Sequence, residues 1–223
     1  MTLIDYPGKV AATVFLVGCN FRCPYCHNPE LVNPSTSSGQ DQIKESSFFK
    51  FLDERKNFLD GVCITGGEPT IHNDLPNFIN KIKKRGFLVK LDTNGSNPDM
   101  LKKLVQENLI DYIAMDIKTS ISKYIKVKAR DKIYSISKSI NIIRTSKKDY
   151  EFRTTVVPEI VDENDINEIG QWLKGAKKIA LQQFRPEKVL DPALNNLKPY
   201  SLQDLEKMLK ILEPHIETVE LRT

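Results

Sequence analysis

Short apolar runs rich in β-branched residues alternate along this chain with longer stretches in which apolar residues recur every three or four positions. The short runs predict strands, and the longer stretches predict amphipathic helices. Strands are expected at residues 10–17, 62–65, 87–92, 112–117, 152–157 and 178–183, and residues 218–221 could add a last one. Helices are expected at residues 44–59, 75–84, 98–106, 133–145, 163–173 and 202–212.

This alternation predicts six βα units around a parallel sheet. We therefore expect an α/β fold, a partial (βα)6 barrel similar to a TIM barrel, in a single domain that spans residues 1–223. Residues 33–42, which contain Pro, Ser, Thr and Gly, are expected to form a loop. Helix starts are indicated by Asn73 or Asp74 for the second helix, Asn97 for the third and Asp162 for the fifth.

The composition is that of a folded domain rather than of a membrane or disordered protein, with 40% hydrophobic and 28% charged residues among 223. The sequence has neither a run of about 18 apolar residues nor an N-terminal leader pattern, so we expect a cytoplasmic protein without a membrane partner. Four cysteines, three of them within eight residues, favour a metal site in a reducing compartment over disulfides.

Basic residues gather between positions 118 and 148, where ten Lys or Arg stand against the single acid Asp131. Such a segment could bind an acidic protein or nucleic acid, but a solvated helical face is the more common explanation. Aromatic residues do not alternate with the basic ones, so a nucleic-acid partner is not expected.

Unusual polar residues follow the predicted strands. In parallel α/β sheets the chemistry collects at the carboxyl ends of the strands, so these residues are expected on one rim. They are Cys19 after the first strand, Gly66, Gly67 and Glu68 after the second, Asp92 at the end of the third, Asp116 and Lys118 at the fourth, Arg153 and Val156 on the fifth, and residues 182–185 at the sixth.

The loop of residues 18–28 carries Cys19, Cys23 and Cys26, three soft ligands close enough to wrap one metal centre. An iron–sulfur cubane held by three thiolates keeps one iron open to a substrate or cofactor. Cys63 lies in the middle of a predicted strand, where a small buried hydrophobic role is expected. The alternative is a structural zinc site that adds His27 or His72 to the three thiolates.

Five motifs resemble one family over nearly the whole chain. They are CNFRCPYCHN at 19–28, TGGEP at 65–69, LDTNG at 91–95, MDIK at 115–118 and RTTVVP at 153–158. Together they resemble the radical S-adenosylmethionine (AdoMet) superfamily, and within it the glycyl-radical-enzyme activating type. The resemblance implies a radical SAM oxidoreductase with one [4Fe–4S] cluster on Cys19, Cys23 and Cys26 that cleaves AdoMet reductively.

The resemblance also implies roles for residues that would hold the methionyl part of AdoMet. The glycines permit close backbone approach, and Glu68 would meet the amino group. Asp92 would share that group or a monovalent cation, Lys118 would meet the carboxylate, and Asp116 would meet a ribose hydroxyl or the amino group. The alternatives are a tight turn for the Gly66, Gly67 and Glu68 motif and a surface ion pair for Asp116 and Lys118.

Other residues would surround the adenine. Tyr25 and His27 are expected to flank it and Val156 to pack on the ring, although His27 could also be an ordinary loop histidine. Arg153 interrupts an apolar strand and needs an anion, which could be AdoMet, Glu68, Asp116 or Glu151. Related enzymes carry a histidine after the sixth strand, and Gln183 could replace its hydrogen bond here.

The resemblance extends to partners. The hydrogen atom removed would come from a glycine Cα of a glycyl radical enzyme, for which an anaerobic ribonucleotide reductase is expected because residues 4–8 (IDYPG) match that group. A flavodoxin or ferredoxin would supply the electron. The alternative from the same superfamily is radical chemistry on a small molecule or modified nucleoside.

Overall fold

The computed structural model describes residues 1–33 and 42–223. In these residues one sheet holds seven parallel strands that lie side by side in sequence order. The strands are β1 (Ala11–Leu16), β2 (Gly61–Gly66), β3 (Leu88–Thr93), β4 (Tyr112–Asp116), β5 (Asp149–Val156), β6 (Lys178–Gln183) and β7 (Thr218–Arg222). The helices are α1 (Glu45–Glu54), α2 (Leu75–Lys83), α3 (Pro98–Gln106), α4 (Ile133–Thr145), α5 (Glu163–Trp172) and α6 (Leu202–Leu212). The predicted α/β fold with six βα units is confirmed, and β7 completes the sheet.

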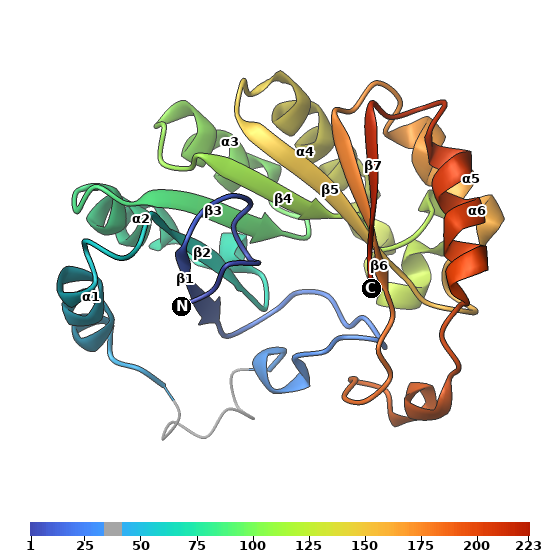
Figure 1. Cartoon of the computed structure of the whole chain (residues 1–223), viewed down its shortest axis with the longest axis horizontal. Helices are drawn as coiled ribbons and strands as arrows, with labels where there is room; N and C mark the ends of the chain where they lie inside the picture. The colour runs from blue at the N-terminus through green and yellow to red at the C-terminus, as the bar shows by residue number, and fades with distance from the viewer. Residues whose placement is uncertain (34–41) are drawn as a thin grey trace.

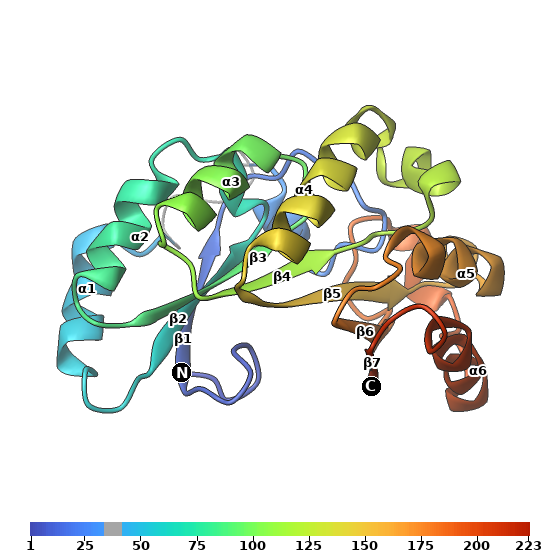
Figure 2. The same cartoon turned by 90° about the horizontal axis from the view of Figure 1, so that it is seen from above.

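The sheet is curved, and the six helices follow one another along its outer side from α1 to α6 (Figures 1 and 2). β1 and β7 are its two edges, because neither strand has a second partner in the sheet. The fold is thus an open barrel rather than a closed one. Among the described residues no helix is long and apolar enough to cross a membrane.

The two faces of the sheet carry opposite chemistry because successive side chains of a strand point to opposite sides. Ile64, Leu91 and Met115 are completely buried in the core shared with the helices. Several alternate positions on the inner face carry charged side chains, and Asp116 of β4 lies directly beside Arg153 of β5 in the strand register. Burial of each large apolar side chain contributes roughly 1.5–3 kcal/mol, so the outer face stabilises the fold and the inner face is left for other roles.

Two of the three predicted helix starts use their side chains as expected. The Asn97 side chain accepts a hydrogen bond from the Met100 backbone N–H at 3.2 Å, and Asp162 begins α5 with a reciprocal capping box. Asp74 precedes α2, but its side chain makes no capping hydrogen bond. A second capping box, formed by Ser201 at the start of α6, was not predicted.

Some boundaries differ from the predictions. The first helix ends at Glu54 instead of residue 59, because the chain turns before the buried Leu59 and leaves Phe58 67% exposed. The fifth strand begins three residues earlier than expected. The additional residues include Glu151. Its carboxylate is buried because it forms an ion pair with Arg222 at 2.6 Å. Most of the predicted loop at 33–42 lies outside the described residues.

Candidate active site

The three predicted cysteine ligands lie on a loop between β1 and the short 3₁₀ helix η1 (Pro29–Leu31). Backbone hydrogen bonds close this loop at its base, from Gly18 N–H to the Leu31 carbonyl at 2.7 Å and from Cys19 N–H to the Val32 carbonyl at 3.2 Å. The Arg22 guanidinium donates to the Cys19 carbonyl at 2.6 Å. The loop is therefore fixed by its own backbone around the space that the thiols share.

The loop after β2 packs directly on the cysteine loop. Gly67 N–H donates to the Leu16 carbonyl, and Glu68 N–H donates to the Gly18 carbonyl, both at 2.8 Å. A Cβ on Gly67 would lie 2.0 Å from the Gly18 oxygen, and Gly66 has a φ of +118° with Leu16 backbone atoms within 2.4 Å of its ideal Cβ position. Only glycine fits at either position, because Gly66 lies against the end of β1 and Gly67 lies against the start of the cysteine loop.

Glu68 is fully buried and joins the ends of β2 and β3. Its Oε1 accepts hydrogen bonds from the Thr70 hydroxyl at 2.5 Å and from the Thr93 hydroxyl at 2.7 Å, and its Oε2 accepts one from Asn94 N–H at 2.6 Å. Burial raises the pKa of Glu68, although these hydrogen bonds act in the opposite direction. Oε2 has only this one donor within the described residues, so it can accept another from a ligand in the pocket.

Five charged side chains of alternating sign cross the inner face of the sheet. Lys90 donates to Asp92, whose other oxygen accepts from Arg153 Nη1 at 3.1 Å. Arg153 Nε donates to Asp116 Oδ1 at 2.8 Å, and Lys118 Nζ donates to Asp116 Oδ2 at 2.9 Å. Of the partners that the sequence left open for Arg153, the structure selects Asp116, and it adds Asp92.

These contacts determine the protonation states of the central pair. Burial alone would raise the pKa of Asp116, but the charges of Arg153 and Lys118 outweigh it and hold the pKa well below its usual range. Burial opposes the charge on Lys118, yet the adjacent Asp116 raises the pKa of this lysine. Both groups are charged at neutral pH and form an ion pair at the pocket wall.

The three thiols and four of these charged side chains, all but Lys90, line one pocket of about 250 Å³. Burial raises the pKa of Cys19, and it raises the pKa of Cys23 to about 12. The lining comprises Cys19, Phe21, Cys23, Tyr25, Cys26, His27, Asn28, Val32, Thr65, Gly66, Gly67, Glu68, Asp92, Thr93, Asn94, Asp116, Lys118, Arg153, Thr155 and Gln182. The structure thus brings together most of the residues that the sequence placed on one rim, but not Val156 or residues 183–185.

Two residues that were predicted to contact AdoMet lie outside the pocket. Val156 is 1% exposed and belongs to the apolar core, and Gln183 donates to the Tyr200 carbonyl at 3.0 Å. These two residues are register partners on β5 and β6 and do not line the pocket. Because strand side chains alternate, their preceding neighbours Thr155 and Gln182 line it instead.

Tyr25 and His27 line the pocket, but both side chains already have partners. The Tyr25 hydroxyl donates to the Lys118 carbonyl at 2.9 Å, and the ring is 4% exposed. His27 Nε2 lies 2.8 Å from the Arg185 carbonyl, and its ring stacks on Phe184 with 6.1 Å between centroids. Both residues therefore fix the cysteine loop to neighbouring segments.

Sequence reasoning missed two features of the site. Lys90 is 2% exposed and supports Asp92 from within the barrel, and its signal was a lysine inside an apolar strand, as for Arg153. Asn20 accepts a hydrogen bond from the Asn94 side chain at 3.0 Å and donates to the Ser96 hydroxyl at 2.8 Å. This contact ties the cysteine loop to the loop after β3.

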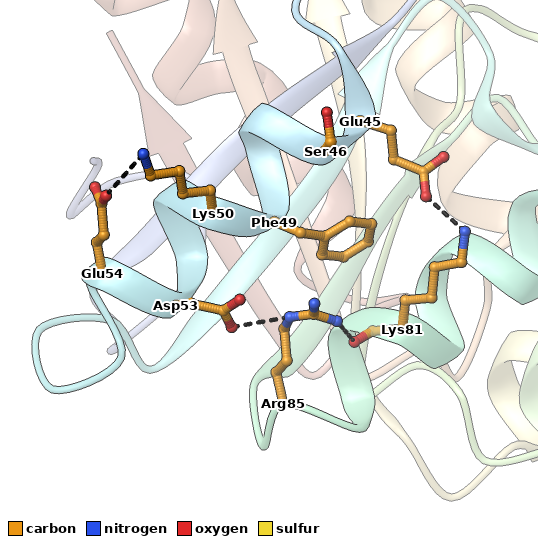
Figure 3. Close-up of a pocket in the computed structure, with 8 residues that line it drawn as sticks. All are labelled: Glu45, Ser46, Phe49, Lys50, Asp53, Glu54, Lys81 and Arg85. Carbon is orange, nitrogen blue, oxygen red and sulfur yellow. Dashed lines mark hydrogen bonds and ion pairs between the residues drawn. The ribbon is translucent and has the colours of Figure 1, made fainter.

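A second hollow lies between α1 and α2 (Figure 3). Its charges pair with each other, Lys81 with Glu45 at 2.6 Å and Arg85 with Asp53 at 2.9 Å, and the Arg85 guanidinium lies 4.4 Å from the centroid of the Phe49 ring. Figure 3 shows that these side chains bridge the two helices. The hollow is a helix contact and holds no cysteine or histidine.

The relatives of this chain identify its family. A family model of the radical SAM superfamily matches residues 13–173. The chain belongs to the radical SAM superfamily. A Methanocaldococcus jannaschii protein, described provisionally as a glycyl-radical enzyme activating enzyme, is 37% identical over all of this chain and 93% of its own length. The pyruvate formate-lyase-activating enzyme of Clostridium pasteurianum is 26% identical over 94% of this chain and 89% of that enzyme. Within the superfamily, the chain groups with these activating enzymes.

Solved structures show the same fold. Streptococcus suis SuiB bound to S-adenosylmethionine matches with a TM-score of 0.70 at 16% identity, over 96% of this chain and 50% of SuiB. This chain therefore spans about half the length of SuiB. A domain of pyruvate-formate lyase-activating enzyme from Bacteroides vulgatus matches with a TM-score of 0.55 at 17% identity, over 71% of this chain and 98% of that domain.

Radical SAM membership implies a [4Fe–4S] cluster and AdoMet, and the donor set fits them. No three His, Cys, Asp or Glu side chains in the described part of the chain are arranged to hold a metal ion. Ligands of one zinc ion must converge to about 2.3 Å from it, whereas a cubane presents separate irons to separate thiolates. Cys19, Cys23 and Cys26 line one pocket, where each thiolate could bind a separate iron of such a cluster.

Proposed function

We propose that this protein is an activating enzyme that cleaves AdoMet reductively at one [4Fe–4S] cluster and generates a glycyl radical on an anaerobic ribonucleoside-triphosphate reductase. The observation that carries the proposal is the single pocket shared by Cys19, Cys23 and Cys26 with the charged residues at the strand ends. The choice of reductase rests on the match of residues 4–8 to that group of activating proteins. When bound, the cluster supplies the electron that breaks a carbon–sulfur bond of AdoMet.

The chain's own residues would bind the methionyl group and orient it. Lys118 has ammonium protons left after its bond to Asp116 and would donate them to the AdoMet carboxylate. The free acceptor capacity of Glu68 Oε2 suits the AdoMet amino group. Asp116 can accept from a ribose hydroxyl without changing its protonation state.

Asp92 and Arg153 would act through position rather than by direct contact. Each Asp92 oxygen accepts one hydrogen bond, from Lys90 and from Arg153, and these two cations hold the carboxylate in place and balance its charge. Arg153 then fixes the carboxylate of Asp116 at the pocket wall. Phe21 and Tyr25 are almost completely buried, and their rings would form apolar walls that exclude water from the reacting atoms.

The test is an anaerobic reconstitution with iron and sulfide, reduction with dithionite in the presence of AdoMet, and assay of 5′-deoxyadenosine. Wild-type protein should form it, and adding the reductase should produce a glycyl radical signal by electron paramagnetic resonance. Cys23→Ala should lose both products, whereas Cys63→Ala, which changes a buried strand cysteine away from the pocket, should keep both.

Two outcomes would contradict the proposal at different levels. Absence of 5′-deoxyadenosine under every reducing condition would contradict radical chemistry. Formation of 5′-deoxyadenosine without a glycyl radical on the reductase or on pyruvate formate-lyase would contradict the partner, and it would favour the small-molecule or nucleoside alternative.

A further inference from the structure

The basic segment 118–148 has no part in the function proposed above except for Lys118. The structure divides its ten cations into two sets. Six are hydrogen-bonded or ion-paired: Lys118 to Asp116, Lys123 to Asp162 and Asp165, Lys126 to the Glu159 carbonyl, Lys132 to Asp131, Lys138 to Asp99 and Lys148 to Asn108. In the other four, the side chain makes no hydrogen bond or ion pair with the residues that the structure describes: Lys128, Arg130, Arg144 and Lys147.

Two of these unpaired cations stand beside exposed apolar side chains. Lys128 follows the 3₁₀ helix η3 (Ile121–Val127), and Arg130 begins the next one, η4 (Arg130–Lys132). Ile121 is 42% exposed and Ile125 is 57% exposed. Ile125, Lys128 and Arg130 line one shallow hollow together with Asp131. We call the surface of Ile121, Ile125, Lys128 and Arg130 the η3 patch.

The buried side of the same segment contacts the cysteine loop. Tyr124 and Val127 are completely buried, and the Val127 carbonyl accepts a hydrogen bond from Arg22 N–H at 3.3 Å. Arg22 directly precedes Cys23 in the chain. A protein that covers Ile125 and Lys128 would therefore lie against a segment whose other side supports the proposed cluster ligands.

A cluster held by this loop must receive one electron for each AdoMet cleaved. The described part of the chain offers no other redox group, because its fourth cysteine, Cys63, is a single buried thiol. The electron must therefore come from a separate molecule. Electron-transfer complexes are typically small and transient, and charge complementarity steers their association.

We propose that the η3 patch is the docking site of an acidic one-electron carrier protein, of the ferredoxin or flavodoxin type. The inference rests on the proposed function, since it takes the cysteine loop as the cluster site. Lys128 and Arg130 attract the acidic carrier, and Ile121 and Ile125 provide the apolar centre of the contact. In the step itself the reduced carrier loses one electron and the cluster gains it, with no bond formed or broken at the surface.

The experiment compares two double charge reversals. Lys128→Glu with Arg130→Glu changes the patch. Arg144→Glu with Lys147→Glu is the matched control, because it makes the same change of charge at unpaired cations of the same basic segment. Those two residues flank the end of α4, which leads into the amino end of β5, whereas the cysteine loop follows the carboxyl end of β1.

Each reconstituted protein is assayed for 5′-deoxyadenosine with dithionite and, separately, with a reduced acidic ferredoxin that carries two [4Fe–4S] clusters. With dithionite all three proteins should react at equal rates. With ferredoxin at low ionic strength the patch variant should be slower by about tenfold or more, and the control should remain within about twofold of wild type. Added salt should reduce the difference, because it screens the steering charges.

Binding is measured independently on the metal-free proteins, by calorimetric titration with the oxidised ferredoxin and with a flavodoxin. The patch variant should lose about tenfold in affinity for the carrier, and the control should not. Equal losses in both variants, or none in either, would overturn the proposal. A loss of glycyl radical formation with dithionite in the patch variant would also overturn it, because the patch would then bind the glycyl radical enzyme.

Failure of the proposed function would be seen separately. If wild-type protein formed no 5′-deoxyadenosine with dithionite, the function would be contradicted. The titration would still decide whether the patch binds an acidic carrier, because it needs no cluster.

Discussion

The hollow between α1 and α2 and the pocket at the strand ends are both lined by charged side chains, and they differ in how those charges are supported. Between α1 and α2 the partners are exposed and each ion pair stands alone, as with Arg85 and Asp53 (Figure 3). At the strand ends, Asp92 and Asp116 share one cation, the Arg153 guanidinium, whose side chain is 13% exposed. Exposed ion pairs contribute little to stability, whereas removing one partner of a buried ion pair leaves a buried charge uncompensated and is strongly destabilising. A rigid set of buried charges is what a polar ligand of mixed charge requires.

The largest expected effect comes from removing the shared cation. Arg153→Met leaves Asp92 and Asp116 buried without their common partner, so the unfolding free energy of the metal-free protein should fall by about 3–5 kcal/mol. Urea denaturation followed by circular dichroism measures this change. A loss below about 1 kcal/mol would mean that Lys90 and Lys118 compensate the two carboxylates by themselves.

The next effect concerns the glycines that bring the loops together. Gly67→Ala places a methyl group 2.0 Å from the Gly18 oxygen, and it should cost about 1–3 kcal/mol and displace the loop that carries Cys19. Gly86→Ala is the control. This glycine has a φ of +90° with no atom within 4 Å of its Cβ position, so alanine costs about 1–2 kcal/mol through the backbone alone. Iron content after reconstitution should fall in the first variant and stay at the wild-type value in the second.

A smaller effect is expected in the pH dependence of stability. The pKa of Asp116 is lower in the folded than in the unfolded protein, where it is about 3.9. On acidification the unfolded state therefore takes up the proton first. The stability from Asp116 is fully present above about pH 4 and is lost as the pH falls below that value. Glu68 acts with the opposite sign, because burial raises its pKa in the folded state.

Asp116→Asn isolates this contribution. Between pH 7 and about pH 5 the unfolding free energies of wild type and variant should differ by a constant amount, and the difference should shrink from there to pH 3, because wild type alone begins to lose the Asp116 contribution. Parallel curves would contradict the ionised state of Asp116 and, with it, the ion pair that distinguishes this pocket from the hollow between the helices.

Much of the fold could be predicted because its signals are local. The helices Pro98–Gln106, Ile133–Thr145 and Leu202–Leu212 begin and end where the apolar periodicity predicts. The early start of β5 could not be predicted from periodicity, because Glu151 is buried through a contact with Arg222, 71 residues away. A charged residue normally indicates an exposed position, but a partner far away in the sequence allows it to be buried.

The site shows the same limit at finer scale. The motifs placed the right segments on one rim, because the carboxyl ends of parallel strands lie together. They did not settle which of two neighbouring residues faces inward: Thr155 and Gln182 line the pocket, and Val156 and Gln183 do not. The alternation of side chains along each strand decides which residue faces the pocket. Because Arg153 faces inward, Thr155, two residues later on the same strand, could have been predicted to do so as well.

The smallest effect is expected in the hollow between α1 and α2. Arg85→Ala removes an exposed ion pair with Asp53 and the contact with the Phe49 ring, so the unfolding free energy should fall by about 1 kcal/mol or less. Iron loading and AdoMet cleavage should equal those of wild type, because Arg85 contacts no part of the pocket lined by the cysteines. A change in AdoMet cleavage with unchanged stability would mean that the hollow communicates with the pocket. The contrast between a hollow that joins two helices and a pocket built for a ligand would then no longer hold.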